Sequence, residues 1–150
     1  IQVIPDFELY ICGGVEQGED FWLNEIKNRP WIKYFGHVKD PGVLYAKTMA
    51  TITTTYHEGL STICLESAAC ARPILGTNIP GVKEVIDDGD TGLLIRPGDV
   101  NDVVKIVMKF NKLTYSEKKQ MGLRAYKKVC DNFDRKNVVK FYLNAISKNI

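Results

Sequence analysis

Two glutamates, a glycine and several hydroxyl side chains lie close together in the middle of this 150-residue chain. The segment reads YHEGLSTICLE over residues 56–66, and it places Glu58 and Glu66 eight positions apart. A strand-like stretch precedes Glu58 and an apolar, helix-like stretch follows Gly59, so the segment predicts a helix N-terminus. Free backbone N–H groups and the helix dipole favour a phosphate there, and a glycine lets a ligand approach the main chain closely. The segment therefore predicts a site for an anionic ligand.

The side chains around this helix start refine the prediction. Ser61 could cap the helix, but the residue at the third helical position is Cys64, so the Glu or Gln of a capping box is absent and amide donors remain for a ligand. Glu66 stands in an otherwise apolar helix, where we expect it to be buried and to need hydrogen-bond partners. A sugar diol would supply them, and a salt bridge with a residue such as Arg72 is the alternative.

The elements that must position this segment alternate between strands and helices. Buried strands are expected at residues 7–12, 31–38 and 49–56, and further strands at 73–77 and 91–96. Helices are expected between them at 19–28, 41–47, 61–71 and 81–87. Three more helices follow, capped by Asp99, Ser116 and Asp134, and the last carries a stripe of Val138, Tyr142 and Ala145.

This alternation predicts an α/β fold, a Rossmann-like parallel sheet flanked by helices on both faces and spanning residues 1–150 as a single domain. Such sheets bind ligands at the carboxyl ends of their strands. Three segments are expected at those ends: Gly13-Gly14, His37 onward, and residues 57–62.

Composition and charge exclude several classes of function. The chain is 45% hydrophobic and 25% charged, as in an ordinary globular domain, and its net charge of +2 comes from scattered residues that predict no nucleic-acid partner. It has no apolar run long enough to span a membrane and no signal-peptide pattern at its start. It begins with Ile1 rather than Met and enters a strand-like run at once, so we expect a piece of a longer polypeptide.

Other motifs with a chemical meaning give weaker signals. Cys12, Cys64, Cys70 and Cys130 form no CxxC pair and are expected to be reduced packing residues. Asp88-Gly89-Asp90 has the form of an Asp-x-Asp metal motif, but Asp-Gly marks a turn, so no metal is expected. The G-x-G-x-x-G fingerprint of NAD binding and the G-x-S-x-G elbow of a hydrolase are both absent from the sequence.

The motif and the residues after it resemble the retaining glycosyltransferases of the GT-B architecture. The hallmark of that family is Glu, seven residues, Glu, here Glu58 and Glu66, and the agreement continues through ESAACARPILGTNIPGVKEVIDDGDTGLLIRPGD. The resemblance extends over nearly the whole chain. It implies that the chain is the nucleotide-sugar-binding, C-terminal half of a GT-B fold, and that an acceptor-binding domain precedes Ile1.

The resemblance also implies roles for individual residues. Glu66 would bind the ribose hydroxyls of the donor, and Glu58 would hold hydroxyls of the transferred sugar as the catalytic residue of this half. Backbone amides would meet the sugar and diphosphate at Gly59, Leu60, Ser61 and Thr62, and the base and phosphate pocket would be lined by Gly13, Gly14 and Val38. In this family the departing diphosphate assists deprotonation of the acceptor, so neither a protein base nor a metal or other cofactor is expected.

The sequence departs from the family pattern at a few positions. Ala71 stands where glycine is usual at the end of the motif helix, Pro80-Gly81 replaces Gly-Gly, and Leu60-Ser61 replaces Phe-Gly. These variants resemble polysaccharide-assembling members, including capsule enzymes. The basic pair that clamps the diphosphate in this family normally lies just before the strand at residues 7–12, so we expect it to precede this chain.

Together these features predict a cytoplasmic hexosyltransferase whose donor is a UDP-sugar and whose acceptor is a glycan or a lipid-linked glycan. A lipid-linked acceptor would bring the parent protein to the inner face of the membrane through its missing half, and the chain alone is expected to be inactive. The alternatives are a nucleotide-sugar-binding module without turnover and a sugar-nucleotide epimerase of the same architecture.

Overall fold

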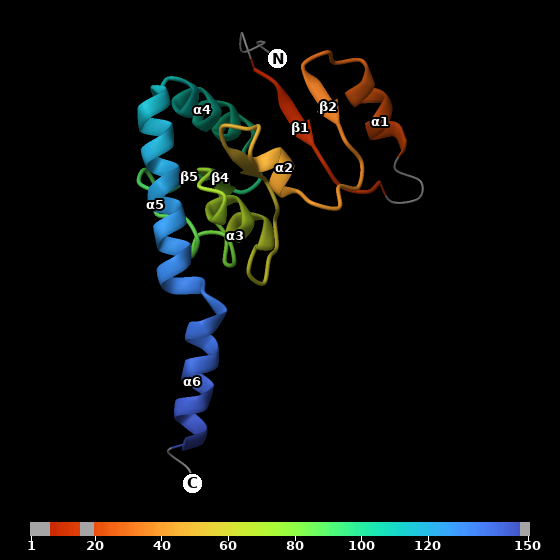
Figure 1. Ribbon diagram of the computed structural model, residues 1–150. Coiled ribbons are helices and arrows are strands. Elements are labelled where there is room, and N and C mark those ends of the chain that lie inside the picture. The colour runs from red at the N-terminus through yellow and green to blue at the C-terminus, as the bar shows by residue number, and fades with distance from the viewer. Residues whose placement is uncertain (1–6, 16–19, 148–150) are drawn as a thin grey trace. The chain divides into compact units, whose positions relative to one another are not determined.

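The computed structural model describes residues 7–15 and 20–147, and the chain divides into two compact units, residues 1–48 and 49–150 (Figure 1). Each unit holds its own parallel sheet. The α/β prediction, with parallel strands flanked by helices, is therefore confirmed. The expectation of a single domain over the whole chain stays a prediction.

Unit 1 is a short βαβ arrangement. Strand β1 (Leu9–Ile11) pairs in parallel with β2 (Ile32–Tyr34), and helix α1 (Asp20–Lys27) lies between them in the chain. A four-residue helix α2 (Gly42–Tyr45) follows. No residue of β1 or β2 is buried, so the prediction of two buried strands was wrong within this unit. Two three-residue strands and one eight-residue helix supply too little apolar surface to enclose a sheet.

Unit 2 contains a three-stranded parallel sheet in the order β3-β4-β5. The strands are β3 (Thr51–Thr53), β4 (Ile74–Thr77) and β5 (Gly92–Ile95). Helix α3 (Thr62–Ala69) connects β3 to β4, and three helices follow β5: α4 (Val100–Asn111), α5 (Tyr115–Phe133) and α6 (Arg135–Ser147). All four residues of β4 are buried, as expected for the central strand of a covered sheet.

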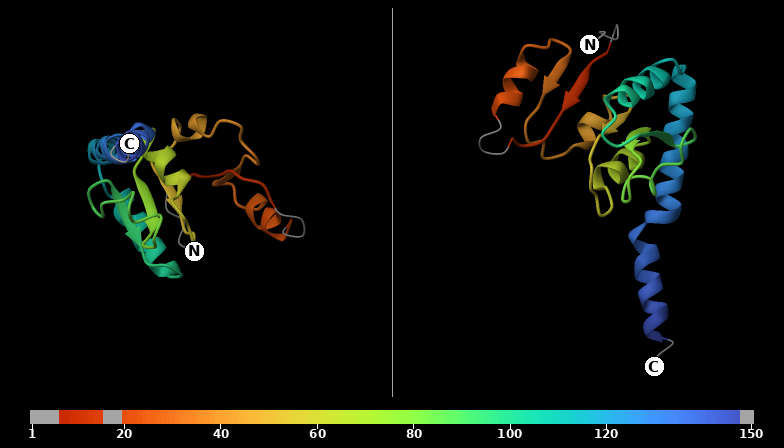
Figure 2. Two further views of the ribbon diagram at one scale, coloured as in Figure 1. Left: turned by 90° about the horizontal axis from the view of Figure 1, so that it is seen from below. Right: turned by 180° about the vertical axis from the view of Figure 1, so that it is seen from behind.

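The core of unit 2 lies on both faces of this sheet. Figure 2 shows the helices and strands of this unit from two further sides. Ile74 of β4 packs in a cluster with Cys64 and Ala68 of α3 and Ala125 of α5. The next residue, Leu75, packs in a second cluster with residues of β5 and α4, including Leu93 and Phe110. Successive residues of a strand point to opposite faces, so one strand joins two apolar layers.

The helix starts confirm two predicted caps and correct a third. The Asp99 side chain accepts a hydrogen bond from the N–H of Asp102 at the start of α4, and that of Asp134 accepts one from Lys136 at the start of α6. The cap of α5 is Thr114, two residues before the predicted Ser116, because Thr114 and Glu117 form a capping box that satisfies two backbone donors.

Residues 81–87 were predicted as a helix, but residues 81–85 form turns and 86–87 are irregular. Gly81 has a φ of +85°, outside the helical region, and its N–H donates to the Glu84 carboxylate at 2.7 Å.

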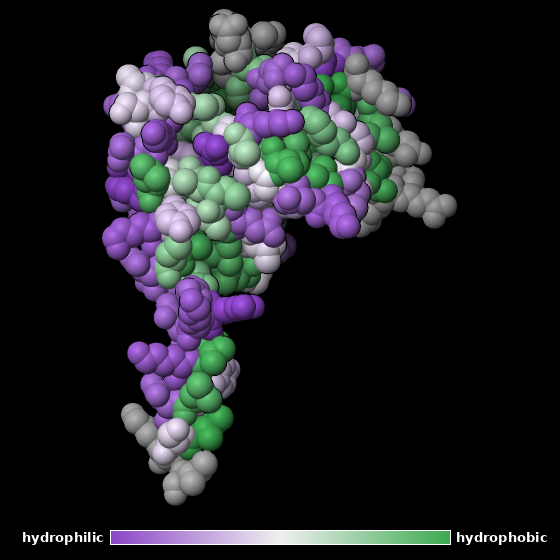
Figure 3. Space-filling view, in the orientation of Figure 1, coloured by the Kyte–Doolittle hydropathy of each residue, from purple (hydrophilic) through white to green (hydrophobic). Residues whose placement is uncertain are grey.

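Helix α6 carries the predicted apolar stripe, and Figure 3 shows apolar side chains gathered along one side of it. No residue of α6 is buried in the structure. The cysteine prediction holds in part: all four cysteines are free, but only Cys64 is a buried packing residue, whereas Cys12, Cys70 and Cys130 are exposed.

Candidate functional site

The loop that follows β3 is held by hydrogen bonds to its neighbours in unit 2. Thr77, at the end of β4, donates its hydroxyl to the carbonyl of Thr55 at 2.7 Å. The Thr55 hydroxyl in turn donates to the carbonyl of His57 at 3.1 Å. Because both strands are parallel, their carboxyl ends meet at one edge, and Thr77 fixes the loop where it leaves that edge.

Helix α3 starts without a side-chain cap, although the sequence offered Ser61 as one. Ser61 precedes the helix in an extended conformation and makes no side-chain cap hydrogen bond, and the first turn holds no acidic residue. Thr62 is exposed, whereas Ser61 is only 1% exposed and its hydroxyl has no hydrogen-bond partner among the described residues. No carboxylate from the first turn of α3 therefore neutralises the positive N-terminal end of the helix dipole.

The backbone groups of the Glu58–Ser61 loop differ in exposure and in hydrogen bonding. Gly59 and Leu60 are exposed, and Leu60 is 44% so. The N–H of Ser61, in contrast, donates to the carbonyl of Gly81 at 2.8 Å. In this conformation the Ser61 amide is engaged by the Gly81 carbonyl, and the exposed backbone of the loop lies at Gly59, Leu60 and Thr62. The expectation that the Ser61 amide contacts a ligand stays a prediction.

Glu66 lies on the exposed face of α3, so the expectation of a buried carboxylate was wrong. The buried face of this helix is made by Cys64, Ser67 and Ala68 instead. Glu66 stands four positions after Thr62, and both are exposed, so the two share one face one turn apart. The carboxylate is thus placed one turn behind the helix start, where a ligand held at the first turn could reach it.

Glu58 is half-buried and lies close enough to α3 to act on it electrostatically. Burial raises the pKa of the Cys64 thiol, and the negative charge of Glu58 adds to that rise. The Cys64 thiol is therefore held in its neutral form beneath the loop. A packing role follows for Cys64, with no nucleophilic one.

The second set of predicted residues lies in unit 1, at the ends of β1 and β2. Gly13 donates its N–H to the carbonyl of Gly36 at 2.8 Å and accepts the Tyr34 hydroxyl on its own carbonyl at 2.7 Å. Gly14 is exposed and Val38 is half-buried. The structure therefore brings the carboxyl ends of these two strands together within unit 1, and separately groups Glu58 to Glu66 within unit 2.

Three residues that hold this region were not among the predicted site residues. Gly81 contacts the Glu58–Ser61 loop directly, Glu84 accepts the N–H of Gly81, and Thr77 contacts Thr55 just before the loop. Gly81 and Glu84 belong to the IPGVKEV segment that carried part of the family resemblance. The segment from Gly81 was predicted as a helix, and no sequence spacing indicated which loop it would contact.

Across residues 7–15 and 20–147, no group of three or more His, Cys, Asp and Glu side chains is placed to hold a metal ion. In the same part of the chain, none of the helices combines the length and apolar character needed to cross a bilayer.

A family model described as glycosyl transferases group 1 matches residues 1–111, which include the loop, α3 and the turns after β4. The chain belongs to the glycosyl transferases group 1 family. The predicted family is confirmed, and the motif from Glu58 to Glu66 lies within the matched range.

Several curated glycosyltransferases are similar to this family member. The O-antigen chain mannosyltransferase B of Escherichia coli is 33% identical over 99 residues, covering 62% of this chain and 26% of that protein. The N-acetyl-alpha-D-glucosaminyl L-malate synthase of Bacillus anthracis is 29% identical over 111 residues, covering 74% and 29%. The capsular polysaccharide biosynthesis glycosyltransferase CapM of Staphylococcus aureus is 26% identical over 95 residues, covering 63% and 24%. The chain thus spans about a quarter of the length of these relatives.

Solved structures share its fold. HepE of Anabaena, in a complex with UDP and glucose, superposes with a TM-score of 0.85 at 18% identity, covering 98% of this chain and 42% of that one. Sucrose-phosphate synthase of Thermosynechococcus elongatus superposes with a TM-score of 0.82 at 17% identity, covering 97% and 40%. At these identities the likeness establishes the fold of this family member.

Proposed function

We propose that this chain is the donor-binding part of a retaining glycosyltransferase that takes its sugar from a nucleoside diphosphate sugar. The observation that carries the proposal is the helix α3 without a side-chain cap, preceded by the Glu58–Ser61 loop, inside the range matched by the family. A diphosphate suits this place because the helix start offers N–H donors and a positive dipole end. Glu66, exposed one turn further on, suits the ribose hydroxyls.

The donor is proposed to be a UDP-sugar. HepE has been solved with UDP-glucose, and the pneumococcal O-GlcNAc transferase GtfA with UDP and GlcNAc; both share the fold of this chain. The curated relatives differ in the sugars that their names state, mannosyl in one and N-acetylglucosaminyl in another, so the sugar itself is left open.

In the proposed reaction, the bond between the anomeric carbon and the diphosphate oxygen breaks while the acceptor hydroxyl forms a new bond on the same face of the sugar. The proton of that hydroxyl passes to the departing diphosphate, so no side chain of this unit has to act as a base. Glu58 holds hydroxyls of the transferred sugar, and the Gly59–Thr62 segment, apart from the engaged Ser61 amide, faces the diphosphate. The acceptor is proposed to be a glycan or lipid-linked glycan, bound by the parent protein in the cytoplasm at the inner face of the membrane.

The test is a calorimetric titration of the chain with UDP, GDP and ADP, each with and without magnesium. We expect binding of UDP in the millimolar range, unchanged by magnesium. Tighter binding of GDP or ADP than of UDP would show that the donor carries a nucleobase other than uracil, while the donor site itself would stand. No binding by any of the three would overturn donor binding by this chain.

A further inference from the structure

We infer that Gly81 and Glu84 are positioning residues that hold the Glu58–Ser61 loop in the shape needed to receive the donor, an inference that rests on the proposed function. Gly81 lies in the turns after β4, not in the loop itself. Its carbonyl accepts the N–H of Ser61 at 2.8 Å, which joins the two segments next to the start of α3.

The contact at Gly81 leaves no room for a side chain. A Cβ atom added there would lie 2.7 Å from the carbonyl oxygens of both Glu58 and Gly59 and 2.9 Å from the carbonyl carbon of Glu58. These are backbone atoms, so they can make room only if the loop itself moves. The φ of +85° independently favours glycine at this position. Only glycine therefore fits at position 81, because any side chain there would collide with the backbone carbonyls of Glu58 and Gly59.

Glu84 fixes Gly81 in turn. One carboxylate oxygen of Glu84 accepts the N–H of Gly81 at 2.7 Å, across three residues of the turn. Charge-assisted bonds of this kind are stronger than neutral ones, and this one orients the peptide next to the carbonyl that Ser61 uses. The chain of contacts runs from Glu84 through Gly81 to Ser61 and so to the first turn of α3.

The test compares Gly81→Ala with Gly89→Ala. Gly89 has nearly the same backbone angle, a φ of +83°, but an added Cβ would meet nothing within 4 Å. Both variants carry the strain of alanine in a left-handed conformation, and only Gly81→Ala collides with the loop. We expect Gly81→Ala to weaken UDP binding about tenfold or more, the size of a lost hydrogen bond, and Gly89→Ala to change it less than about twofold.

A second pair of variants, at Glu84, tests the same inference if Gly81→Ala does not fold. Glu84→Ala removes the acceptor and is expected to weaken UDP binding, whereas Glu84→Gln keeps an amide oxygen in reach of Gly81 and should restore most of it. Glu117→Ala is the matched control, because Glu117 also accepts a backbone N–H at 2.7 Å but does so at the start of α5.

Failure of the proposed function and failure of the positioning role can be told apart by NMR. The measurement is the change in amide chemical shift of residues 58–62 between variant and unaltered chain, recorded without nucleotide. If the unaltered chain binds no nucleotide, the proposed function fails, and the loop shifts alone decide the positioning role. Larger shifts at these amides in Gly81→Ala than in Gly89→Ala would support it. Equal shifts and equal UDP affinities in the two variants would overturn it, as would equal UDP affinities for Glu84→Ala and Glu117→Ala.

Discussion

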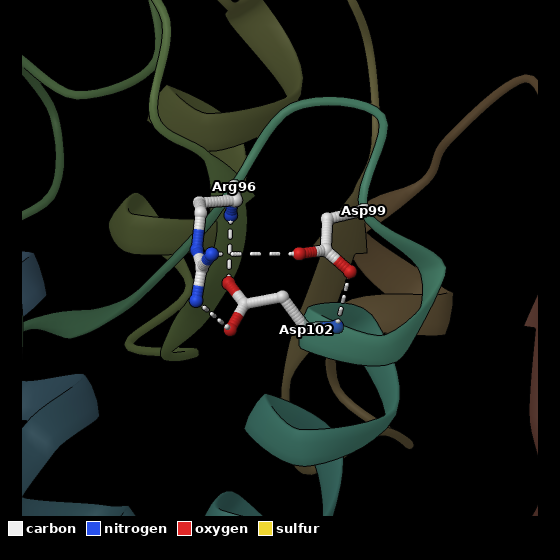
Figure 4. A network of polar contacts seen from close by, with 3 residues as sticks. All are labelled: Arg96, Asp99 and Asp102. Atoms are coloured by element: carbon white, nitrogen blue, oxygen red, sulfur yellow. Dashed lines mark hydrogen bonds and ion pairs between the residues drawn. The ribbon is translucent and has the colours of Figure 1, made fainter.

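The carboxylate of Asp102 accepts a hydrogen bond from the backbone N–H of Arg96 at 2.8 Å, which ties the first turn of α4 to the residue that follows β5 (Figure 4). Asp102 is 8% exposed, and its own N–H donates to the Asp99 cap at 3.0 Å. The guanidinium of Arg96 lies 3.7 Å from Asp99 and 3.9 Å from Asp102. Asp102 thus joins the sheet to α4 through main-chain as well as side-chain contacts.

Replacing Asp102 by alanine should lower the free energy of unfolding by about 1–3 kcal/mol, because a backbone donor and the helix start lose their partner. Denaturant unfolding measures this change. Arg96→Ala is the control: its side chain is 72% exposed, so loss of the ion pairs should cost less than about 1 kcal/mol. A larger loss for Arg96→Ala than for Asp102→Ala would show that the ion pairs, not the main-chain contact, make this junction.

Ala71 follows the C-cap of helix α3 with a φ of +54° and is the one non-glycine residue with a positive φ in the described part of the chain. Its N–H bonds to the carbonyl of Ala68, and the N–H of Arg72 bonds to that of Ser67, which together form a Schellman motif. Ala71→Gly should therefore raise the free energy of unfolding by about 0.5–1 kcal/mol, since relief of left-handed strain exceeds the added flexibility of the unfolded chain. Thermal unfolding, with Ala69→Gly inside the helix as the destabilising control, checks the sign.

The capping box of α5 should make stability depend on pH in the acid range. The hydroxyl of Thr114 and its backbone N–H both donate to Glu117, and these bonds hold the pKa of Glu117 below its usual value. A carboxylate with a lowered folded pKa contributes stability above its unfolded pKa and loses it as the pH falls through the folded pKa. Glu117→Gln should therefore lower the Tm at pH 7, and its Tm should converge with that of the unaltered chain as the pH falls through the lowered pKa of Glu117. A constant difference from pH 7 to pH 3 would contradict this assignment.

Glu66→Ala should weaken UDP binding about tenfold, because an acceptor for two ribose hydroxyls is lost. Its carboxylate is exposed, so the substitution should leave the Tm within a few degrees of the unaltered value. Calorimetry with UDP measures the affinity. Unchanged affinity would remove Glu66 from the donor site.

Glu58→Ala should spare binding of UDP but remove the added affinity that a UDP-sugar has over UDP, because its proposed partner is the sugar. Paired titrations with UDP and UDP-glucose measure the difference. The same substitution in the parent protein should abolish glycosyl transfer. An equal fall in affinity for both ligands would place Glu58 at the nucleotide instead.

The sequence by itself was enough for the fold class, the family and the place of the candidate site. Alternation of apolar strands and amphipathic helices is a local property, and the caps Asp99 and Asp134 act within a few residues, so both could be recognised in one dimension. The Glu58 to Glu66 motif likewise lies within a single stretch of chain. The Ser116 cap was wrong because Thr114 and Glu117 offered a better local pairing, one that the sequence also contained.

Only the tertiary structure decided how the loop is held and which side chains face solvent. The exposure of Glu66 depends on which face of α3 packs against Ile74 and Ala125, and the engagement of the Ser61 amide depends on a turn twenty residues further along the chain. The requirement for glycine at position 81 follows from its close approach to the carbonyls of Glu58 and Gly59, which only the folded structure shows. Contacts between segments far apart in the chain arise from packing, and their geometry is not encoded in the spacing of the residues along it.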